Sequence, residues 1–263
     1  MKALDGKELA GFIKARQAHQ VASMSIKPKL LILRDSDNPV ITKYVNLKKK
    51  YGEDIGINVQ DYRATSSSAI FTKINSANTD NSIHGIIIQL PLTNSSTAEA
   101  LCNSLSPAKD VDGLGAHARY DSATATAISW LLAGYDIKLN NQKIALVGRG
   151  KLVGAPLYKM FTNSGYNVTL FHRGDDLTKL NQYDIIITAT GHPGLITSSM
   201  LKPGAVVVDA GTASENGVLK GDLTEEARQR TDLAAITPKT GGVGPLTITC
   251  LFDHVIEAAL NSK

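Results

Sequence analysis

The chain has 263 residues, of which 43% are hydrophobic and 20% charged, and its formal net charge is +4. These proportions are those of ordinary globular proteins, so they exclude a disordered or fibrous chain, and the length allows two modest domains or one large one. The charge is too small for a typical nucleic-acid binder, and only residues 43–50 are locally basic. That basic stretch is either the solvated face of a helix or a feature that attracts a small anionic substrate.

The cysteines and the N-terminus indicate a cytoplasmic protein. Cys102 and Cys250 are far apart, lie in apolar stretches and have no histidine cluster nearby, so we expect buried free thiols, no disulfide and no metal site. Charged residues interrupt the first ten positions, where a signal peptide would be apolar. Apolar runs such as residues 85–88 and 205–208 have the length of strands and are too short to cross a membrane. We therefore expect a soluble protein without membrane or nucleic-acid partners.

Short apolar runs alternate along the chain with amphipathic stretches, which is the pattern of repeated strand–helix units. The predicted strands are residues 29–34, 56–62, 85–89, 143–147, 167–171, 184–188 and 205–209. The predicted helices are residues 39–51, 68–77, 96–105, 123–132, 154–164 and 247–261. Parallel strands joined by helical crossovers form a three-layer α/β architecture. A turn-rich run closes the first group of strands, so we place a domain junction near residue 120. From these patterns alone, the last helix fits either domain.

Four polar residues in the first half are candidates for chemistry. Tyr44 and Lys48 lie four positions apart and share one face of the predicted helix. Gln89 ends an apolar strand, and ligands of open α/β sheets gather at the carboxyl ends of strands. The turn at residues 110–113 carries Asp112 and one further carboxylate, of which at most one need be structural. Lysine and tyrosine pairs also occur on plain helix surfaces, so that alternative stays open.

A predicted strand, residues 143–147, runs directly into a glycine-rich turn that opens the next helix. Glycine at the end of a strand permits a tight turn and lets the backbone approach a pyrophosphate, while the helix presents free N–H groups to it. The glycines are Gly148, Gly150 and Gly154, with the spacing GxGxxxG rather than the usual GxGxxG. The turn therefore predicts a dinucleotide site, with a plain strand-to-helix turn as the alternative.

The end of the next strand indicates which dinucleotide binds. NAD-binding units place an acidic residue there to bind the ribose hydroxyls. Here the strand is followed by His172 and Arg173, and Arg149 lies in the glycine turn. A guanidinium group binds a 2′-phosphate in bidentate fashion, whereas a carboxylate repels it. We therefore predict NADP rather than NAD, with Arg173 as a solvated loop residue as the alternative.

Ordered segments along nearly the whole chain match the pattern of one known family. They are LDGK at residues 4–7, YVxxK at 44–48, GIIIQLPL at 85–92, KDVDG at 109–113, GR at 148–149 with VGxP at 153–156, ATGxPG at 189–194, KPGAVV at 202–207, ITP at 236–238 and GGVGP at 241–245. With these segments at matching separations, the chain resembles the methylenetetrahydrofolate dehydrogenase/cyclohydrolase family.

The resemblance implies a bifunctional enzyme of one-carbon metabolism. It would oxidise 5,10-methylenetetrahydrofolate with NADP⁺ and hydrolyse the 5,10-methenyl product to 10-formyltetrahydrofolate. Lys48 would be the acid/base group of the hydrolysis, held and tuned by Gln89. Tyr44 would line the cleft over the reacting ring, and Asp112 would bind the pterin. The chemistry agrees, because a lysine must lose its proton to act as a base and burial favours that loss.

The resemblance also implies an N-terminal three-layer α/β domain and a C-terminal Rossmann domain that binds NADP, with a cleft between them. The domains would comprise residues 1–120 with 245–263, and residues 121–244, because the last helix of the family returns to the first domain. A homodimer and a folate substrate that can carry a polyglutamate tail are further expectations. The expected substrate-binding residues are Tyr44, Lys48, Ile88, Gln89, Leu90, Asp112, Gly242, Gly244 and Pro245. The expected cofactor-binding residues are Thr124, Gly148, Arg149, Gly150, Val153, Gly154, His172, Arg173, Thr190, Gly191 and Thr212.

Most departures from the family pattern lie around the expected cofactor site. The family motif Pro-Cys-Thr-Pro-x-Gly is replaced at residues 122–127, where only Thr124 is retained, and the serine of Gly-Arg-Ser is replaced by Gly150. These changes leave two alternatives: a cyclohydrolase with an impaired dehydrogenase, and a regulatory protein that binds folate or NADP without turnover. The intact Lys48 argues against the regulator, because a sensor needs no acid/base group.

Overall fold

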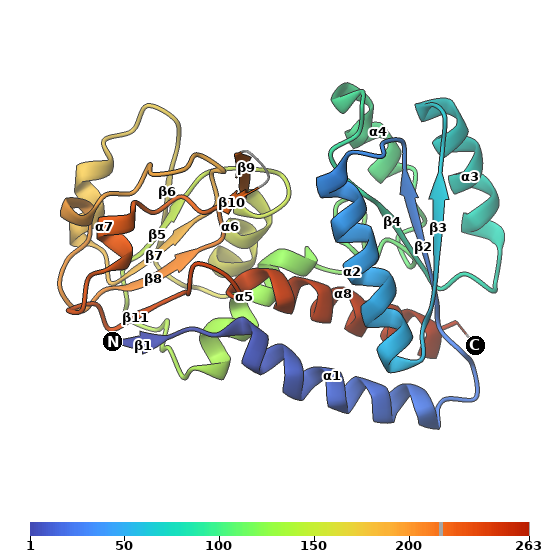
Figure 1. Cartoon of the computed structure of the whole chain (residues 1–263), viewed down its shortest axis with the longest axis horizontal. Coiled ribbons are helices and arrows are strands. Elements are labelled where there is room, and N and C mark those ends of the chain that lie inside the picture. Colours follow the sequence, from blue (N-terminus) through green and yellow to red (C-terminus); the bar gives the residue numbers. More distant parts are fainter. Residues whose placement is uncertain (216–217, 263) are drawn as a thin grey trace. The chain divides into compact units, whose positions relative to one another are not determined.

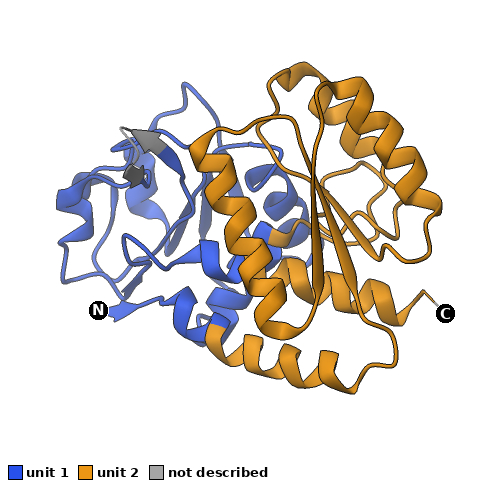
Figure 2. Cartoon of the chain, turned by 45° about the vertical axis from the view of Figure 1, so that its right-hand side comes forward, with its two compact units in different colours: residues 1–10, 124–247 blue, residues 11–123, 248–263 orange. Residues whose placement is uncertain are grey.

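The computed structural model describes residues 1–215 and 218–262. The chain forms two compact units (Figure 2). Unit 1 comprises residues 1–10 and 124–247, and unit 2 comprises residues 11–123 and 248–263. Each contains a parallel sheet with helical crossovers, which confirms the predicted α/β class. The unit boundaries fall inside three helices, namely α1 (Gly6–Ser23), α5 (Ala123–Gly134) and α8 (Val243–Leu260).

The sheet of unit 2 has the order β3-β2-β4 and is parallel throughout (Figure 1). Its strands are β2 (Lys29–Arg34), β3 (Asn58–Arg63) and β4 (Gly85–Ile88). The central β2 and the strand β4 are almost wholly apolar and buried, as parallel strands covered on both faces must be. β3 lies at the edge and carries polar and exposed residues. The carboxyl ends of β2 and β4 therefore point the same way, and Gln89 directly follows β4.

Helices cover both faces of this sheet. On one face, α3 (Ser67–Thr79) and α4 (Ala98–Asn103) pack against Leu31 and Leu33. On the other face, α2 (Pro39–Ile55) and α8 approach the strands so closely that a side chain on Gly52 would meet both Val59 and Phe252. Unit 2 is therefore the predicted three-layer α/β arrangement.

Helix α2 begins and ends at positions set by its sequence. The side chain of Asn38 accepts a hydrogen bond from Val40 N (2.9 Å), and Pro39 occupies the first turn, where its missing N–H costs nothing. The helix ends at Gly56, which adopts a left-handed conformation with φ of 82°. These two signals fix which residues lie within the helix, and so place Tyr44 and Lys48 on successive turns.

A buried polar network ties α2 to α1 and α8. The Tyr51 hydroxyl lies 2.7 Å from Gln17 Oε1 and 3.2 Å from Thr249 Oγ1, and Gln17 Nε2 donates to Thr249 O (2.9 Å). Gln17 is fully buried, so these groups satisfy one another in place of water. The Tyr51 ring also stacks on Phe252 at 4.9 Å. This network fixes the part of α2 that lies one turn beyond Lys48.

Unit 1 contains a doubly wound sheet of the order β1-β11-β8-β7-β5-β6. Its strands are β1 (Lys2–Ala3), β5 (Ile144–Val147), β6 (Val168–Phe171), β7 (Ile185–Thr188), β8 (Val206–Asp209) and β11 (Ala235–Ile236). The chain passes from β5 to β6 on one side and then to β7 on the other, so the winding reverses between β5 and β7. Ligands of such sheets bind at the carboxyl ends of the strands at this reversal. Further elements are α6 (Gly154–Asn163), α7 (Glu225–Arg228) and the antiparallel pair of β9 (Ala213–Glu215) and β10 (Val218–Lys220).

The structure differs from what the sequence predicted mainly at the N-terminus of the chain. Helix α1 was not predicted, because its apolar and polar residues are interspersed around the helix without a one-sided apolar stripe. The strands β1 and β11 have two residues each, too few for a recognisable pattern. Because β1 pairs with β11, residues 1–10 lie in unit 1, whereas the expected boundaries had placed them with residues 11–120.

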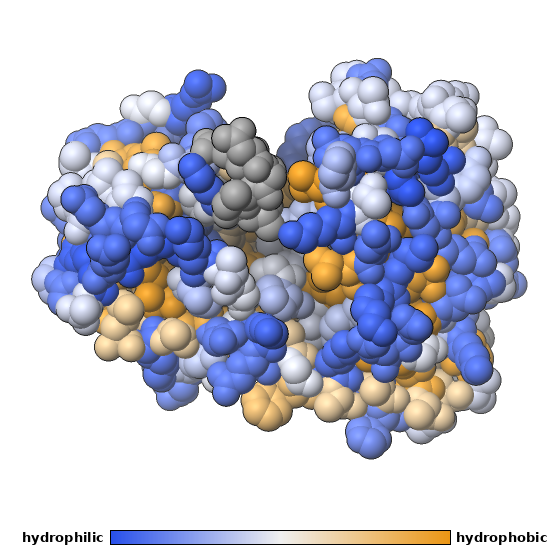
Figure 3. All heavy atoms as spheres, in the orientation of Figure 1, coloured by the Kyte–Doolittle hydropathy of each residue, from blue (hydrophilic) through white to orange (hydrophobic). Residues whose placement is uncertain are grey.

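Helix α8 is the one helix of the described residues that is long and apolar enough to cross a membrane. More than half of it, 56%, is buried inside the protein, and the core helix of a soluble protein passes the same test. Phe252 and Val255 on this helix are fully buried. On the molecular face drawn in Figure 3, hydrophilic residues predominate over apolar ones. We interpret α8 as a core helix, apolar because it is packed against the sheet of unit 2.

The polar network around Tyr51 predicts a measurable loss of stability. Tyr51→Phe keeps the ring stacked on Phe252 but removes the hydroxyl that bonds Gln17 and Thr249. We expect a loss of about 1–3 kcal/mol in unfolding free energy, because a buried acceptor loses its partner. Urea denaturation followed by circular dichroism measures it. Tyr62→Phe, at a partly exposed tyrosine of β3, is the control and should change little. Equal midpoints for Tyr51→Phe and wild type would contradict the role of the network.

Candidate functional site

Lys48 and Gln89 meet at the carboxyl edge of the sheet of unit 2. The Lys48 Nζ donates to Gln89 Oε1 at 2.6 Å. Gln89 is itself held in place, since its backbone N donates to Leu33 O (2.8 Å) and its Nε2 donates to Leu90 O (3.0 Å). With its amide nitrogen engaged, the side chain must present its oxygen to the lysine. The predicted pair of a helix-borne lysine and a strand-end amide is therefore a direct contact.

Burial and charge act in opposite directions on Lys48 and Asp112. Burial lowers the pKa of Lys48, because an ammonium group is less stable away from water, and the charge of Asp112 partly reverses that effect. Burial raises the pKa of the Asp112 carboxyl, while the charges of Lys48 and His254 lower it. Burial also raises the pKa of the half-buried Tyr44, which keeps its phenol neutral. The site thus holds a lysine with easier access to its neutral form.

The two carboxylates of the turn at residues 110–113 have different roles. Asp110 is buried, and its oxygens accept hydrogen bonds from Gly113 N (3.1 Å) and Gly115 N (2.7 Å). It therefore fixes the backbone of the turn. Asp112 is half-buried, and its backbone O accepts from Ala123 N (3.1 Å). The contact with a ligand that was predicted for Asp112 stays a prediction.

The turn that carries Asp112 is contacted by His254, and Tyr120 stacks on that histidine. The sequence had indicated neither residue. His254 on α8 bonds through Nδ1 to Val111 O at 2.8 Å, so that nitrogen carries the proton. The Tyr120 ring stacks on His254 with centroids 4.8 Å apart. Only the fold brings residues so distant in the chain together, and neither belongs to a motif that sequence reasoning could have found.

Ile88 and Leu90 were expected to bind substrate, but their side chains face the core. Ile88 is buried in β4 within the cluster that contains Leu33 and Leu101, and Leu90 packs against the same cluster. The Ile88 side chain is therefore out of reach of a ligand, whereas Leu90 is only partly buried. The other expected substrate residues, Gly242, Gly244 and Pro245, belong to unit 1 and surround the start of α8.

The glycine turn of unit 1 follows β5 at the reversal of the sheet. Gly148 has φ of 104°, and a Cβ there would lie 2.8 Å from Ala189 O. A Cβ on Gly154, the first residue of α6, would collide with Gly148 O. A Cβ on Gly150, by contrast, would meet no atom within 4 Å, so the turn has open space beside it. A tight turn, an open face and a helix N-terminus fit the pyrophosphate of a dinucleotide. Val153 is the residue that precedes α6.

The two arginines expected to bind a 2′-phosphate lie at neighbouring strand ends. Arg149 follows β5 and Arg173 follows β6, and these strands pair at Val147 and Phe171. Both arginines and His172 are exposed or half-exposed. The nearest acid, Asp175, is engaged by the backbone, since it accepts from His172 N (2.6 Å). The arrangement leaves two cationic side chains beside the glycine turn.

The remaining expected cofactor residues lie on further loops of unit 1 and on α5. Thr190 and Gly191 follow β7, Thr212 follows β8, and Thr124 lies in the first turn of α5. Gly148 and Thr190 are close, because a Cβ on Gly148 would lie 3.2 Å from Thr190 Cγ2. The loops after β5 and β7 thus meet where the winding of the sheet reverses. In residues 1–215 and 218–262, no group of His, Cys, Asp and Glu is arranged to hold a metal ion.

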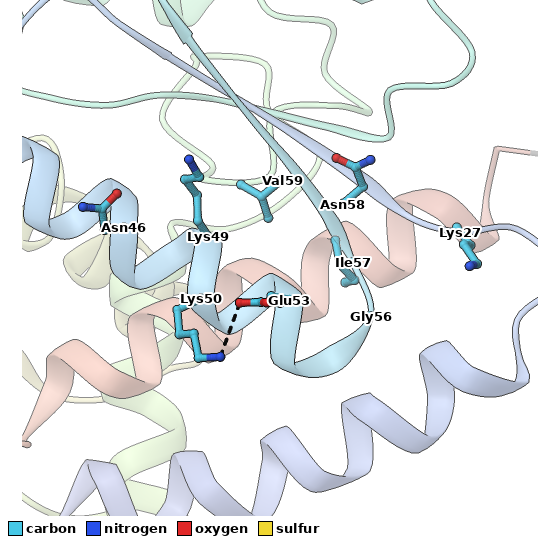
Figure 4. A pocket seen from close by; sticks show the side chains of 9 residues that line it. All are labelled: Lys27, Asn46, Lys49, Lys50, Glu53, Gly56, Ile57, Asn58 and Val59. Atoms are coloured by element: carbon cyan, nitrogen blue, oxygen red, sulfur yellow. Dashed lines mark hydrogen bonds and ion pairs between the residues drawn. The ribbon is translucent and has the colours of Figure 1, made fainter.

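A lysine-rich pocket on unit 2 is separate from this site. Figure 4 shows Lys27, Lys49 and Lys50 around it, with Lys50 turned to Glu53 on the same helix. The pocket lies near Asn58, at the amino end of β3, whereas Gln89 follows the carboxyl end of β4. It therefore opens at the opposite edge of the sheet from Lys48 and Gln89.

Comparison with known proteins identifies the family. Residues 4–112 match the family model "Tetrahydrofolate dehydrogenase/cyclohydrolase, catalytic domain", and residues 122–263 match "Tetrahydrofolate dehydrogenase/cyclohydrolase, NAD(P)-binding domain". The "Bifunctional protein FolD" of Macrococcus caseolyticus is 34% identical over 100% of this chain and 99% of its own, and that of Amoebophilus asiaticus is 37% identical over 98% and 96%.

Solved structures agree with these relatives. The bifunctional FolD enzyme of Campylobacter jejuni has a TM-score of 0.93 and 32% identity, covering 99% of both chains. The Trypanosoma brucei dehydrogenase-cyclohydrolase, solved with NADP cofactor and an inhibitor, has a TM-score of 0.89 and 26% identity, covering 99% of this chain and 97% of its own. The chain therefore belongs to the tetrahydrofolate dehydrogenase/cyclohydrolase family.

Proposed function

We propose that this protein is a bifunctional enzyme that oxidises 5,10-methylenetetrahydrofolate with NADP⁺ and hydrolyses the methenyl product to 10-formyltetrahydrofolate. The observation that carries the proposal is the 2.6 Å contact of Lys48 with Gln89, in surroundings that lower the pKa of the lysine. Family models matched over both parts of the chain support the same pair of activities. A spectrophotometric assay of each step tests the proposal.

In the hydrolysis, water adds to the methenyl carbon and the bond from that carbon to N5 breaks. The neutral amine of Lys48 takes a proton from the attacking water, and its ammonium form returns one to N5. One proton is left over and passes to solvent. Burial favours the neutral amine, whereas the oxygen of Gln89 favours the ammonium, so the pair keeps both forms accessible. Tyr44, on the same face of α2, lines the space above the reacting ring.

Asp112 is proposed to hold the pterin. Its carboxylate accepts hydrogen bonds from the amino group and the ring nitrogen, and Asp110 fixes the turn that presents it. Burial makes such charge-assisted bonds stronger than they would be in water. The backbone on either side of Gln89 completes the part of the proposed folate site that unit 2 supplies.

The cofactor is proposed to bind at the carboxyl edge of unit 1. NADP⁺ supplies the acceptor for the hydride. Gly148, Gly150 and Gly154 leave room for its pyrophosphate at the N-terminus of α6, and Arg149 and Arg173 bind its 2′-phosphate. The further proposed contacts are Thr124, Val153, His172, Thr190, Gly191 and Thr212.

A cyclohydrolase with a weakened dehydrogenase is the second candidate. The segment that departs from the family motif forms the first turns of α5, and Ala123, Ala125 and Ala127 are fully buried there. These three side chains pack in the interior. Thr124, which is half-buried, is the one residue of the family motif that this segment retains. Hydrolysis at a normal rate, with oxidation far slower than in the relatives, would favour this candidate.

The location, assembly and substrate form remain proposals. We propose a cytoplasmic homodimer that accepts polyglutamylated folates. The two free, buried cysteines suit a reducing compartment, and the basic stretch at residues 43–50 suits an anionic tail. Sedimentation at micromolar concentration tests the dimer, and a comparison of Michaelis constants for mono- and polyglutamylated substrate tests the tail.

Removal of the lysine should abolish hydrolysis. Lys48→Met preserves the length of the side chain but supplies no acid or base, so we expect cyclohydrolase activity to fall by roughly 10²–10⁴-fold. The fold should persist, because the variant removes a partly desolvated charge. Lys159→Met, at an exposed lysine of α6, is the matched control. Near-normal hydrolysis by Lys48→Met would remove Lys48 from the mechanism.

Replacement of Asp112 should weaken the binding of folate and leave the binding of the cofactor unchanged. We expect Asp112→Ala to weaken folate binding by about 1.5–3 kcal/mol, the scale of hydrogen bonds to a charged group. The affinity for NADP⁺ should stay as in wild type, which makes it the internal control. Calorimetric titration with each ligand measures both values, and an unchanged folate affinity would refute the assigned role.

The two arginines predict a preference for NADP⁺. Because charge-assisted hydrogen bonds contribute roughly 1.5–3 kcal/mol each, NADP⁺ should bind about tenfold to a hundredfold tighter than NAD⁺. Arg173→Ser should remove much of this difference in affinity between NADP⁺ and NAD⁺. Added salt should reduce the difference by screening the charges. Arg119→Ser, in unit 2, should leave it intact. Equal affinities of the wild type for both cofactors at low salt would rule the preference out.

A further inference from the structure

The loop after β7, residues 189–192, contains Thr190 and Gly191 and borders the glycine turn. A Cβ on Gly148 would lie 2.8 Å from Ala189 O and 3.2 Å from Thr190 Cγ2, so the two loops are in contact. The loop has no regular secondary structure of its own, and Gly191 has φ of 66°. One hydrogen bond within the loop joins His192 N to Thr190 Oγ1 (3.1 Å), and further contacts come from the rest of unit 1.

Asp222 supplies those contacts from the interior. Its side chain is fully buried and accepts hydrogen bonds from Thr190 N at 2.7 Å and from His192 N at 3.0 Å. The Thr188 hydroxyl, at the end of β7, donates to the same carboxylate at 2.6 Å. One carboxylate thus binds the last residue of the strand and two amides of the loop that follows it.

Asp222 is itself fixed by a second buried carboxylate. Asp209, the last residue of β8, accepts from Asp222 N (3.0 Å), from Gly211 N (3.0 Å) and from Leu223 N (3.2 Å). Arg228 on α7 pairs with Asp209. Hydrogen bonds therefore join three segments into one network: the loop after β7, the loop after β8 and the segment around Asp222.

The two carboxylates have different partners: Asp209 pairs with a cation, and Asp222 with neutral donors. Arg228 compensates Asp209, whereas the donors to Asp222 given by the described residues are the Thr188 hydroxyl and the two loop amides. A buried carboxylate is stable only where such donors are held toward it, so the placement of the Asp222 side chain and the shape of the loop depend on each other.

We propose that Asp222 is a positioning residue of the cofactor site, which holds the loop at residues 189–192 in the shape that receives the dinucleotide. The inference rests on the proposed function, since it assumes that this loop contacts NADP⁺. Asp222 acts through the loop, because its side chain is buried beneath it. With the loop ordered in advance, the binding of the cofactor need not supply the free energy of ordering it.

The test compares two substitutions. Asp222→Asn places an amide N–H₂ where the carboxylate accepted from loop N–H groups, so we expect the Kd for NADP⁺ to rise by tenfold or more. Thr188→Val keeps the shape of the side chain and removes only the hydroxyl donor, so we expect a rise of about threefold. Asp232→Asn, at a surface carboxylate paired with Arg230, is the matched control and should leave the Kd unchanged.

Binding is measured by calorimetry at a temperature where circular dichroism shows each variant folded. Hydrogen exchange of the peptide that spans residues 188–193 is recorded without cofactor, and it should be faster in both variants. Cyclohydrolase activity, which depends on unit 2, should be retained. A merely structural Asp222 would lower the melting temperature without raising the Kd of the folded variant.

The outcomes separate this inference from the proposed function. A wild-type protein that fails to bind NADP⁺ would refute the proposed function. A wild type that binds, with both variants binding equally well, would overturn the role of Asp222. Faster exchange in the loop with an unchanged Kd would overturn it too, because the order of the loop would then not matter to the cofactor. If Asp222→Asn does not fold, Thr188→Val decides alone, and an unchanged Kd there refutes the inference.

Discussion

The arrangement of unit 2 keeps one lysine, Lys48, partly out of water. Lys48 would be a fully charged surface residue on an isolated helix. Here α2 places it against Gln89, and burial lowers its pKa while Asp112 opposes the change. Much of the fold of unit 2 serves this placement. Asn38 and Gly56 set the ends of α2, the network of Tyr51 fixes its second half, and the apolar strand β4 delivers Gln89 to the edge of the sheet.

Both units use pairs of aspartates in which one member fixes the backbone. In unit 2, Asp110 accepts from the amides of its turn and fixes the backbone that carries Asp112. In unit 1, Asp209 binds the backbone of Asp222, and the Asp222 side chain in turn binds the loop at residues 189–192. A carboxylate suits this purpose because its two oxygens accept several N–H groups at once. Loops at the carboxyl ends of parallel strands thereby gain the order that they lack as isolated segments.

The strands and the motif residues could be predicted because their signals are local. Buried parallel strands are apolar runs, a helix spacing puts Tyr44 and Lys48 on one face, and a strand end marks Gln89. The pairing of Lys48 with Gln89 came from the resemblance to the family. The rest depends on contacts that no local pattern records. Helix α1 has no one-sided apolar stripe, and β1 is defined only by its pairing with β11. His254 and Asp222 gain their importance from partners far away in the chain. Ile88 was expected to bind substrate from the resemblance to the family, and the strand turns its side chain into the core.

The discontinuity of unit 2 has a consequence for how the protein is made on the ribosome. Residues 248–263 complete this unit, yet the chain reaches them only after all of residues 124–247. Until then, Tyr51 lacks both Thr249 and the ring of Phe252, and one face of the sheet lacks the helix that covers it. Unit 1 needs only its first ten residues from elsewhere, so its sheet can close earlier during synthesis. The half that carries Lys48 is therefore the last to be completed during synthesis.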